Sequence, residues 1–323
     1  MRRGCLFSGL AAIALVLGSL GWLLGGWFLP GPLETDTPFV VPDSAGLRVV
    51  TAKLEAIRAI RSVDGFRLRA RIFGAGSSIK AGEFMLPKGA SPSKILAILS
   101  GDDVIRRFVT VPEGMPSVMV QERLAAQPVL TGSIDAPPEG SVLPNTYDVE
   151  RGESRQAVLR RMQAALQRTL AELWDKRSPD TVAKNPAEAL VLASIVEKET
   201  GKPAERPMVA GLYSNRLRQG IMLQADPTII YPITKGKPLG RRIRQSEISA
   251  INDYNTYSMV GLPHAPITNP GRASIEAVLH PAKTDALYMV ADGTGGHAFA
   301  ATLEQHNGNV QKWFAIRKAR GDF

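Results

Sequence analysis

Glu199 is the residue whose type and position are best suited to chemistry. It lies in the segment Leu192-Ala-Ser-Ile-Val-Glu-Lys-Glu-Thr200, in which Leu192, Ile195 and Val196 precede it by seven, four and three positions. A helix places these four residues on one stripe. A carboxyl group among apolar neighbours keeps its proton to a higher pH than a solvated one, as a general acid working near neutral pH requires. The alternative is a salt-bridged or surface glutamate near a helix end.

The residues around this segment predict the helix that positions it. Asn185 can cap the free N–H groups, Pro186 suits the first helical position, and Glu188 completes a pattern similar to a capping box. Gly201 and Pro203 then end the helix.

Glu197 is the competing acid. In a helix it points roughly away from Glu199, one turn after Ala193 and Ser194. Spacing alone does not exclude Glu197. We favour Glu199 because of its apolar stripe.

The N-terminal segment predicts a membrane anchor. Residues 4–33 contain no charged residue, and a helix of this length crosses ~30 Å of hydrocarbon. Arg2 and Arg3 precede it, which favours a cytoplasmic N-terminus and export of the remainder. A cleaved signal peptide is the alternative, but its apolar region is usually shorter, and Trp22 and Trp27 suit an interfacial anchor.

Composition and charge exclude several classes of function. The chain has 323 residues, of which 44% are hydrophobic and 21% charged, as in an ordinary folded protein. Cys5 is the single cysteine, so the exported part has no disulfide and no cysteine-based metal site. The four histidines lack metal-type spacing, and we predict no metal and no cofactor. The net charge of +9 suits an anionic environment, but export and the scattered arginines argue against nucleic acid.

The pattern of elements predicts an α+β fold in several parts. Residues 1–33 form the cytoplasmic tip and anchor, and 34–44 a turn-rich linker. Residues 45–108 form a small α/β module, 109–152 a connecting segment, and 153–323 a larger mixed α+β domain.

Within these parts, hydrophobic periodicity predicts the main elements. Residues 222–269 are rich in proline, glycine and asparagine and read as irregular, a kind of stretch that often carries function. His297 follows a tight glycine turn and can face the cleft, but we expect it to be structural. The predicted strands are 66–72, 79–86 and 104–111. The predicted helices are 54–60, one that begins at Ser91-Pro92 and ends at Gly101, 116–126, 154–174, 206–217 and one from Leu303, and 287–300 is predicted to be a hairpin.

Several segments between residues 187 and 310 follow one another in a characteristic order. They are Leu192-Ala-Ser-Ile-Val-Glu-Lys-Glu-Thr200, Tyr213-Ser-Asn-Arg-Leu217, Met222-Leu-Gln-Ala-Asp-Pro-Thr228 with Tyr231, Tyr254-Asn-Thr-Tyr257, Gly261-Leu-Pro263, Ile267-Thr-Asn-Pro-Gly271, His280-Pro-Ala-Lys283, and Tyr288 to Phe299. Together they resemble the membrane-anchored endolytic murein transglycosylases of the MltG/YceG type. The module at 45–108 looks like that family's LysM-like domain. The match is more specific than any single motif.

The resemblance implies cleavage of the β-1,4 bond between N-acetylmuramic acid and N-acetylglucosamine. A glutamic acid protonates the leaving oxygen, and its carboxylate then takes a proton from the muramyl C6 hydroxyl, which closes a 1,6-anhydro ring. No water attacks, so the second carboxylate of ordinary glycosidases is not obligatory. Glu199 matches this role, with Glu197 as the runner-up. The Glu199-Thr200 pair is similar to the Glu-Ser pair common in lytic transglycosylases, in which the hydroxyl can orient the carboxyl.

Polar residues in the matching segments are predicted substrate contacts. Gln224 and Asp226 can bind sugar hydroxyl or acetamido groups, and Asp226 can stabilise an oxocarbenium-like transition state, although Asp-Pro also opens turns. Asn255 and Tyr257 can supply a donor and a stacking surface, or simply pack a turn. Arg216 can meet a lactyl or peptide carboxylate, or a structural acid. The full predicted set is Thr200, Arg216, Gln224, Asp226, Thr228, Asn255 and Tyr257.

The resemblance also implies a place of action. It places the enzyme in the inner membrane with its catalytic part in the periplasm, acting on nascent peptidoglycan glycan strands beside penicillin-binding synthases. One rival is a hydrolytic muramidase, with Asp226 or Glu197 activating water. Another is a non-catalytic peptidoglycan-binding scaffold, for which Glu199 is dispensable. A nucleic-acid binder would require the basic surface to be cytoplasmic.

Overall fold

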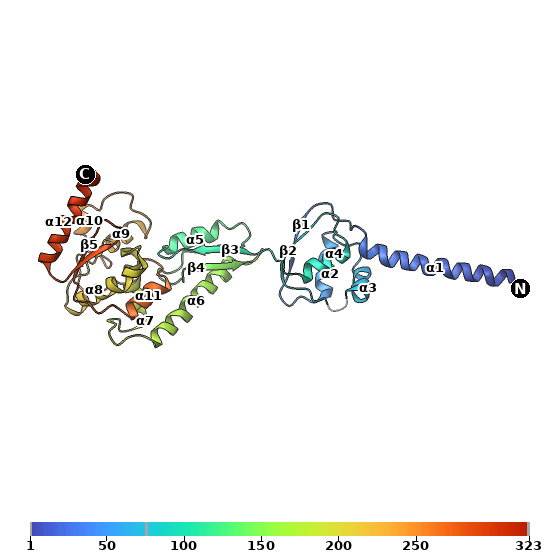
Figure 1. Ribbon diagram of the computed structural model, residues 1–323, viewed down its shortest axis with the longest axis horizontal. Helices are drawn as coiled ribbons and strands as arrows, with labels where there is room; N and C mark the ends of the chain where they lie inside the picture. Colours follow the sequence, from blue (N-terminus) through green and yellow to red (C-terminus); the bar gives the residue numbers. More distant parts are fainter. Residues whose placement is uncertain (1, 75–76, 322–323) are drawn as a thin grey trace. The chain divides into compact units, whose positions relative to one another are not determined.

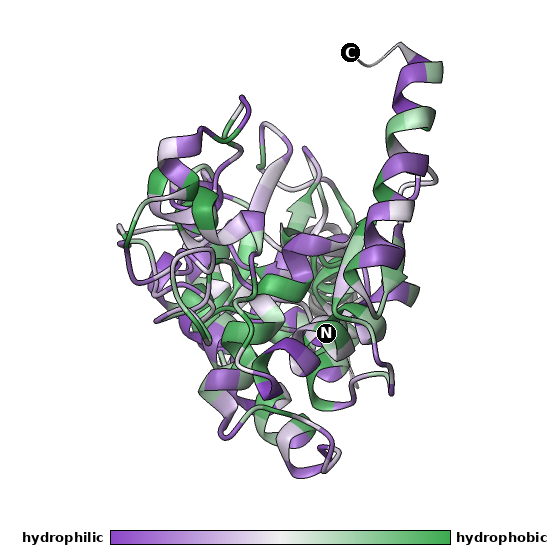
Figure 2. Ribbon diagram, turned by 90° about the vertical axis from the view of Figure 1, so that its left-hand side faces the viewer, coloured by the Kyte–Doolittle hydropathy of each residue, from purple (hydrophilic) through white to green (hydrophobic). Residues whose placement is uncertain are grey.

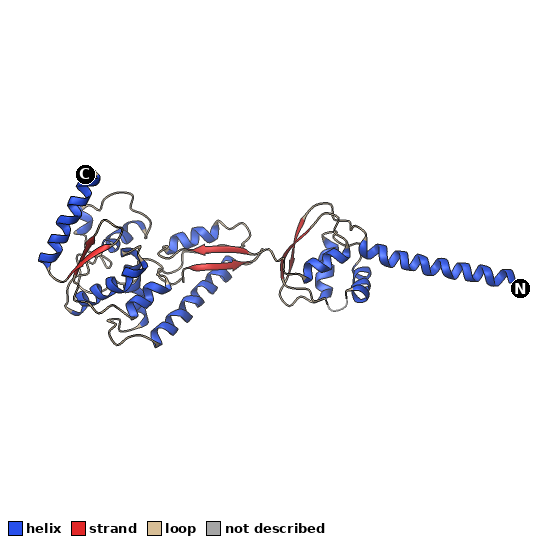
Figure 3. Ribbon diagram, in the orientation of Figure 1, coloured by secondary structure: helices blue, strands red, loops and turns tan. Residues whose placement is uncertain are grey.

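The structure is a computed structural model that describes residues 2–74 and 77–321, with side chains from residue 13 onward. The chain divides into two compact units, Met1–Arg107 and Phe108–Phe323. Both units combine helices with two-stranded sheets, as Figure 3 shows. The predicted α+β class is therefore confirmed.

The first unit packs three helices against one small sheet (Figure 1). Strand β1 (Thr37–Val41) pairs antiparallel with β2 (Gly82–Leu86), and Phe39 lies opposite Phe84. Phe84 is fully buried with residues of all three helices. The helices are α2 (Leu47–Ala56), α3 (Val63–Phe73) and α4 (Pro92–Ser100). The likeness of this part to a LysM module stays a prediction.

Helix α1 (Arg2–Phe28) precedes these elements and packs its last turn on them. Trp27 is 2% exposed and lies 5.6 Å from Phe66, measured between ring centroids. The predicted anchor includes residues whose side chains, up to residue 12, lie outside the described part. Among the described residues, no helix combines the length and apolar character needed to span a membrane.

The strand predicted at 66–72 is wrong, because these residues belong to α3. Ser62 caps the helix by accepting from Gly65 N–H at 3.2 Å, and Phe66 and Ala70 are buried one turn apart. Arg69 shares this face because its guanidinium donates to the carbonyls of Trp22 and Leu23 at the end of α1. Because Arg69 is buried with its hydrogen bonds made, a polar residue lies on the apolar face of the helix. The sequence therefore alternates between apolar residues and arginines, as in a strand.

The second unit is mostly helical. Strands β3 (Arg107–Val111) and β4 (Asn145–Val149) form one sheet. Strands β5 (Tyr288–Ala291) and β6 (His297–Ala300) form the predicted antiparallel hairpin. The helices are α5 (Ser117–Ala125), α6 (Arg155–Asp175), α7 (Pro186–Glu199), η1 (Pro203–Glu205), α8 (Arg206–Arg218), α9 (Asp226–Thr234), α10 (Gln245–Ile248), α11 (Arg272–Leu279) and α12 (Leu303–Arg320).

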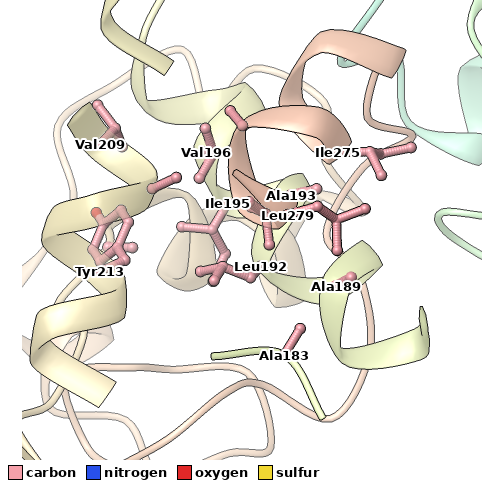
Figure 4. Packing of buried hydrophobic residues seen from close by; sticks show 14 of the residues in the cluster. Ala183, Ala189, Leu192, Ala193, Ile195, Val196, Val209, Tyr213, Ile275 and Leu279 are labelled. Atoms are coloured by element: carbon pink, nitrogen blue, oxygen red, sulfur yellow. The ribbon is translucent and has the colours of Figure 1, made fainter. Parts of the chain in front are cut away.

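Helix α7 runs through the middle of this unit's main core. Figure 4 shows its side chains between those of α8 and α11, and Leu192, Ile195 and Val196 are fully buried. All six residues from Val191 to Val196 are buried, so the helix is covered on every side and not only along the predicted stripe. Removing the side chain of such a residue typically costs about 2–5 kcal/mol. The end of α7 is thus held firmly by its neighbours.

The hairpin and the last helix complete the unit. Tyr288 of β5 stacks on His306 of α12 with ring centroids 5.3 Å apart. Thr302 and Gln305 form a capping box at the start of α12. This helix alternates hydrophilic and hydrophobic residues (Figure 2), and none of its described residues is fully buried.

Candidate active site

Helix α7, which carries Glu199, forms as the sequence predicts. The Asn185 side chain accepts from Glu188 N–H at 2.9 Å, and Pro186 occupies the first turn. Glu199 is the last helical residue, and Thr200 is already extended. A carboxylate at this end faces the negative pole of the helix dipole, which disfavours its charged form.

Glu199 opens into a cavity of about 330 Å³, a size typical of ligand sites. Its Oε1 is buried and has no hydrogen-bond partner among the described residues. Burial raises the pKa of Glu199 to about 7, the hydroxyl of Tyr213 lowers it by hydrogen bonding, and the charge of Asp226 raises it. Near neutral pH the group is therefore poised both to give and to take a proton. The other lining residues are Leu212, Arg216, Leu223, Gln224, Tyr257, Leu287, Tyr288, Met289, Val290, Ala291, His297 and His306.

Glu197 has a different environment, although it lies two residues away. Its carboxylate accepts from Arg206 Nη2 at 3.2 Å, Gly271 N–H at 2.9 Å and Ser274 Oγ at 2.7 Å. The side chain is 5% exposed and does not line the cavity. Glu197 thus joins α7 to α8 and to the first turn of α11. A carboxylate this fully paired is suited to structure and not to proton transfer.

Four predicted residues meet Glu199 in the cavity. Asp226 opens α9 and accepts from the Tyr257 hydroxyl at 2.7 Å, which orients both side chains. Arg216 is buried, and its guanidinium donates to the carbonyl oxygens of residues 222, 223 and 287. It also donates to Gln224 Oε1 at 3.2 Å. Among the described residues Arg216 pairs with no acid, and its hydrogen bonds hold the loop that carries Gln224.

Three predicted residues do not reach the cavity. Thr200 donates to Glu205 Oε2 at 2.9 Å and so turns away from the Glu199 carboxyl. Thr228 is buried against Thr256 at 2.9 Å. The amide of Asn255 donates to the carbonyl oxygens of residues 248 and 250 and accepts from Tyr257 N–H. For these three side chains, internal hydrogen bonds take the place of the predicted substrate contacts.

Comparisons with known proteins identify the family of this chain. A family model described as the YceG-like family matches residues 39–312. The chain belongs to the YceG-like family. A crystal structure of a YceG-like protein from Listeria monocytogenes is similar, with a TM-score of 0.54 and 25% identity, and the match covers 84% of this chain and 98% of that one.

Curated relatives of this YceG-like chain share one name, endolytic murein transglycosylase. The Bacillus subtilis protein is 27% identical over 344 residues, which cover 92% of this chain and 93% of the relative. Proteins from two Streptococcus pneumoniae strains are 34% identical over 178 residues, which cover 53% of this chain and 31% of theirs.

Sequence reasoning on this YceG-like chain missed several lining residues. Tyr213 is 2% exposed, and its hydroxyl contacts the catalytic candidate. It lies in one of the segments that carry the family resemblance, which is the sequence signal that points to it. Tyr288 begins another of these segments, whereas His306 comes from α12, and no local pattern links His306 to Glu199. His297 is both structural and at the cavity: its Nδ1 lies 2.9 Å from Glu205 Oε2.

Proposed function

We propose that this chain cleaves peptidoglycan glycan strands internally by transglycosylation, with Glu199 as the only acid and base. The observation that carries the proposal is the buried Oε1 of Glu199, which has no hydrogen-bond partner among the described residues and lies in a cavity lined by both polar and apolar side chains. The relatives named endolytic murein transglycosylase support the same substrate. One carboxyl that is half protonated near neutral pH can serve both proton transfers.

The chemistry follows from this single group. Protonated Glu199 gives its proton to the oxygen linking the muramyl C1 to the next sugar, and the C1–O bond breaks. The Glu199 carboxylate then takes the proton of the muramyl C6 hydroxyl, whose oxygen bonds to C1. The product ends in 1,6-anhydro-N-acetylmuramic acid, and Glu199 regains the proton that it gave. Asp226, held by Tyr257, adds negative charge near the developing positive charge on the sugar ring.

Mass spectrometry of the products tests this proposal. The purified full chain is incubated with uncrosslinked glycan strands, beside Glu199→Gln and Glu197→Gln. We expect anhydromuramyl ends from the native chain, none from Glu199→Gln, and anhydromuramyl ends from whatever fraction of Glu197→Gln stays folded. Ends that carry an added water would identify a hydrolytic muramidase, with Asp226 in the cavity as its second carboxylate. No cleavage at all would favour a peptidoglycan-binding scaffold.

The proposal includes a place of action. Residues 4–33 would anchor the chain in the inner membrane, with the N-terminus in the cytoplasm and the catalytic unit in the periplasm. This location limits the enzyme to glycan near the bilayer, where penicillin-binding synthases release new strands. A topology reporter fused after Phe323 tests the location: activity of a cytoplasm-specific reporter would contradict it. Crosslinking in cells followed by recovery of synthases tests the partnership.

A further inference from the structure

Gln224 has an unusual backbone at the edge of the cavity. Its φ is 56°, a left-handed conformation that residues other than glycine adopt at a cost in free energy. Its N–H donates to Thr256 O at 3.1 Å, and α9 begins two residues later with Asp226. The side chain is exposed and lines the same cavity as Glu199. Backbone strain of this kind is common at functional sites, where it serves to place a side chain.

Arg216 fixes the direction of the Gln224 amide. Its Nη1 lies 3.2 Å from Gln224 Oε1 and also donates to the carbonyl oxygens of residues 222 and 223. A guanidinium has only donors, so the amide must turn its oxygen, and not its nitrogen, toward Arg216. The Gln224 Nε2 then points away from Arg216, and it has no acceptor in the described part of the chain. The cavity therefore presents a donor of fixed direction.

A donor of fixed direction selects the chemistry of its partner. A sugar hydroxyl both donates and accepts, so either orientation of an amide would bind it. A carbonyl oxygen only accepts, and the 2-acetamido groups of both peptidoglycan sugars carry one. We propose that Gln224 donates a hydrogen bond from Nε2 to the acetamido carbonyl of a sugar beside the scissile bond, and so makes cleavage depend on N-acetylation. This inference rests on the proposed function.

The test compares glycan strands that differ in N-acetylation. The full chain is assayed at one mildly acidic pH on acetylated strands, on strands de-N-acetylated at glucosamine, and on strands de-N-acetylated at muramic acid. We expect kcat/KM of the native chain to fall about tenfold on one of the two modified substrates, as the loss of one such hydrogen bond predicts.

Two variants separate hydrogen bonding from fold. Gln224→Glu keeps the size and the acceptor toward Arg216 but presents an oxygen to the cavity, which attracts the ammonium of a de-N-acetylated sugar. We expect it to reverse the preference, whereas Gln224→Ala brings the ratio of the two substrates near one. The added charge also affects the pKa of Glu199, but it acts on both substrates at the same pH and largely cancels in their ratio. Gln311→Glu, on an exposed part of α12, is the matched control and should keep the native ratio.

The possible failures are distinguishable. Equal rates on all three substrates, or a ratio that Gln224→Glu leaves unchanged while anhydromuramyl ends still form, overturn this inference alone. A preference that follows removal of the stem peptides and not of the acetyl groups also overturns it, in favour of a peptide carbonyl. Absence of anhydromuramyl ends with every substrate overturns the proposed function and this inference with it.

Discussion

Replacing Glu199 or Glu197 by glutamine is expected to change stability in opposite directions. The two residues lie on the same helix end, and each substitution removes one carboxyl with almost no change in shape. In the described part of the chain, Glu199 has a buried oxygen without a hydrogen-bond partner, whereas Glu197 accepts three hydrogen bonds, one of them from a buried arginine. Charged Glu199 therefore lowers the free energy of unfolding, whereas Glu197 raises it.

The magnitude for Glu199 follows from its pKa. Folding raises this pKa from 4.5 to about 7, so between these values the folded chain binds more protons than the unfolded chain. The contribution of Glu199 to stability is therefore greatest below pH 4.5 and falls as the pH rises to about 7, above which it is lost. At about 1.4 kcal/mol per pKa unit, the loss is about 3 kcal/mol. Glu199→Gln does not titrate, so we expect it to be more stable by about this amount at alkaline pH and nearly equal in acid.

The magnitude for Glu197 follows from its partners. Its substitution leaves Arg206, 10% exposed at its side chain, with Glu113 as the remaining acidic partner at 2.9 Å. Breaking a buried ion pair typically costs about 3–5 kcal/mol. Because Glu113 stays in place and glutamine can still accept from Ser274, we expect Glu197→Gln to lose about 2 kcal/mol.

Urea unfolding of the full chain across a pH series measures both effects. The change must appear in the transition of the second unit, which Trp174 and Trp313 report, since the other two tryptophans lie in the first. Glu276→Gln, at an exposed position of α11, is the matched control and should change little. A Glu199→Gln variant that is less stable than the native chain at alkaline pH would refute the assigned environment of Glu199.

Three further predictions concern the same cavity. Tyr213→Phe removes a hydrogen bond that favours charged Glu199, so the alkaline limb of the kcat/KM–pH profile should move to higher pH, and an unchanged limb would contradict this. Asp226→Asn removes a charge that raises the pKa of Glu199, so the same limb should move to lower pH; a shift in the other direction would show that Asp226 acts differently. Glu205→Gln weakens the contacts to His297 and to the loop after α7, which should lower the free energy of unfolding by about 1–2 kcal/mol in urea, and no loss would mean that the contacts are unimportant.

Local sequence signals predicted much of the fold. The helix of Glu199 was predictable because Asn185 and Pro186 give an unambiguous start, and the hairpin because strand-like runs flank Asp292-Gly293. The strand predicted at 66–72 failed because burial of Arg69 depends on carbonyl groups far along the chain. Helix α9 lies within a stretch that the sequence predicts to be irregular. Its internal Pro232 argues against a helix in the sequence, because proline is disfavoured inside helices.

The candidate site was predictable only in part, for the same reason. Glu199 ends a predicted helix, Gln224 and Asp226 are polar residues of the segments that carry the family resemblance, and all three line one cavity. Thr200 and Asn255 lie in equally suggestive segments, but their hydrogen bonds are made within the fold. Which polar groups are already satisfied is decided by tertiary contacts, and sequence spacing does not contain that information.

The three hydrogen bonds of Glu197 have a consequence for how a reaction would proceed. They fix the last turn of α7 to α8 and α11, so the backbone of Glu199, two residues further on, is held rigidly. If Glu199 performs both proton transfers, it must reach the bridging oxygen and the C6 hydroxyl from almost one position. The sugar must then change its conformation. After the C1–O bond breaks, its ring would change pucker and bring the C6 hydroxyl to the Glu199 carboxylate. A structure with the anhydro product bound would show Glu199 in the same position as in the free chain. The distortion of the glycan would then limit the rate of the reaction.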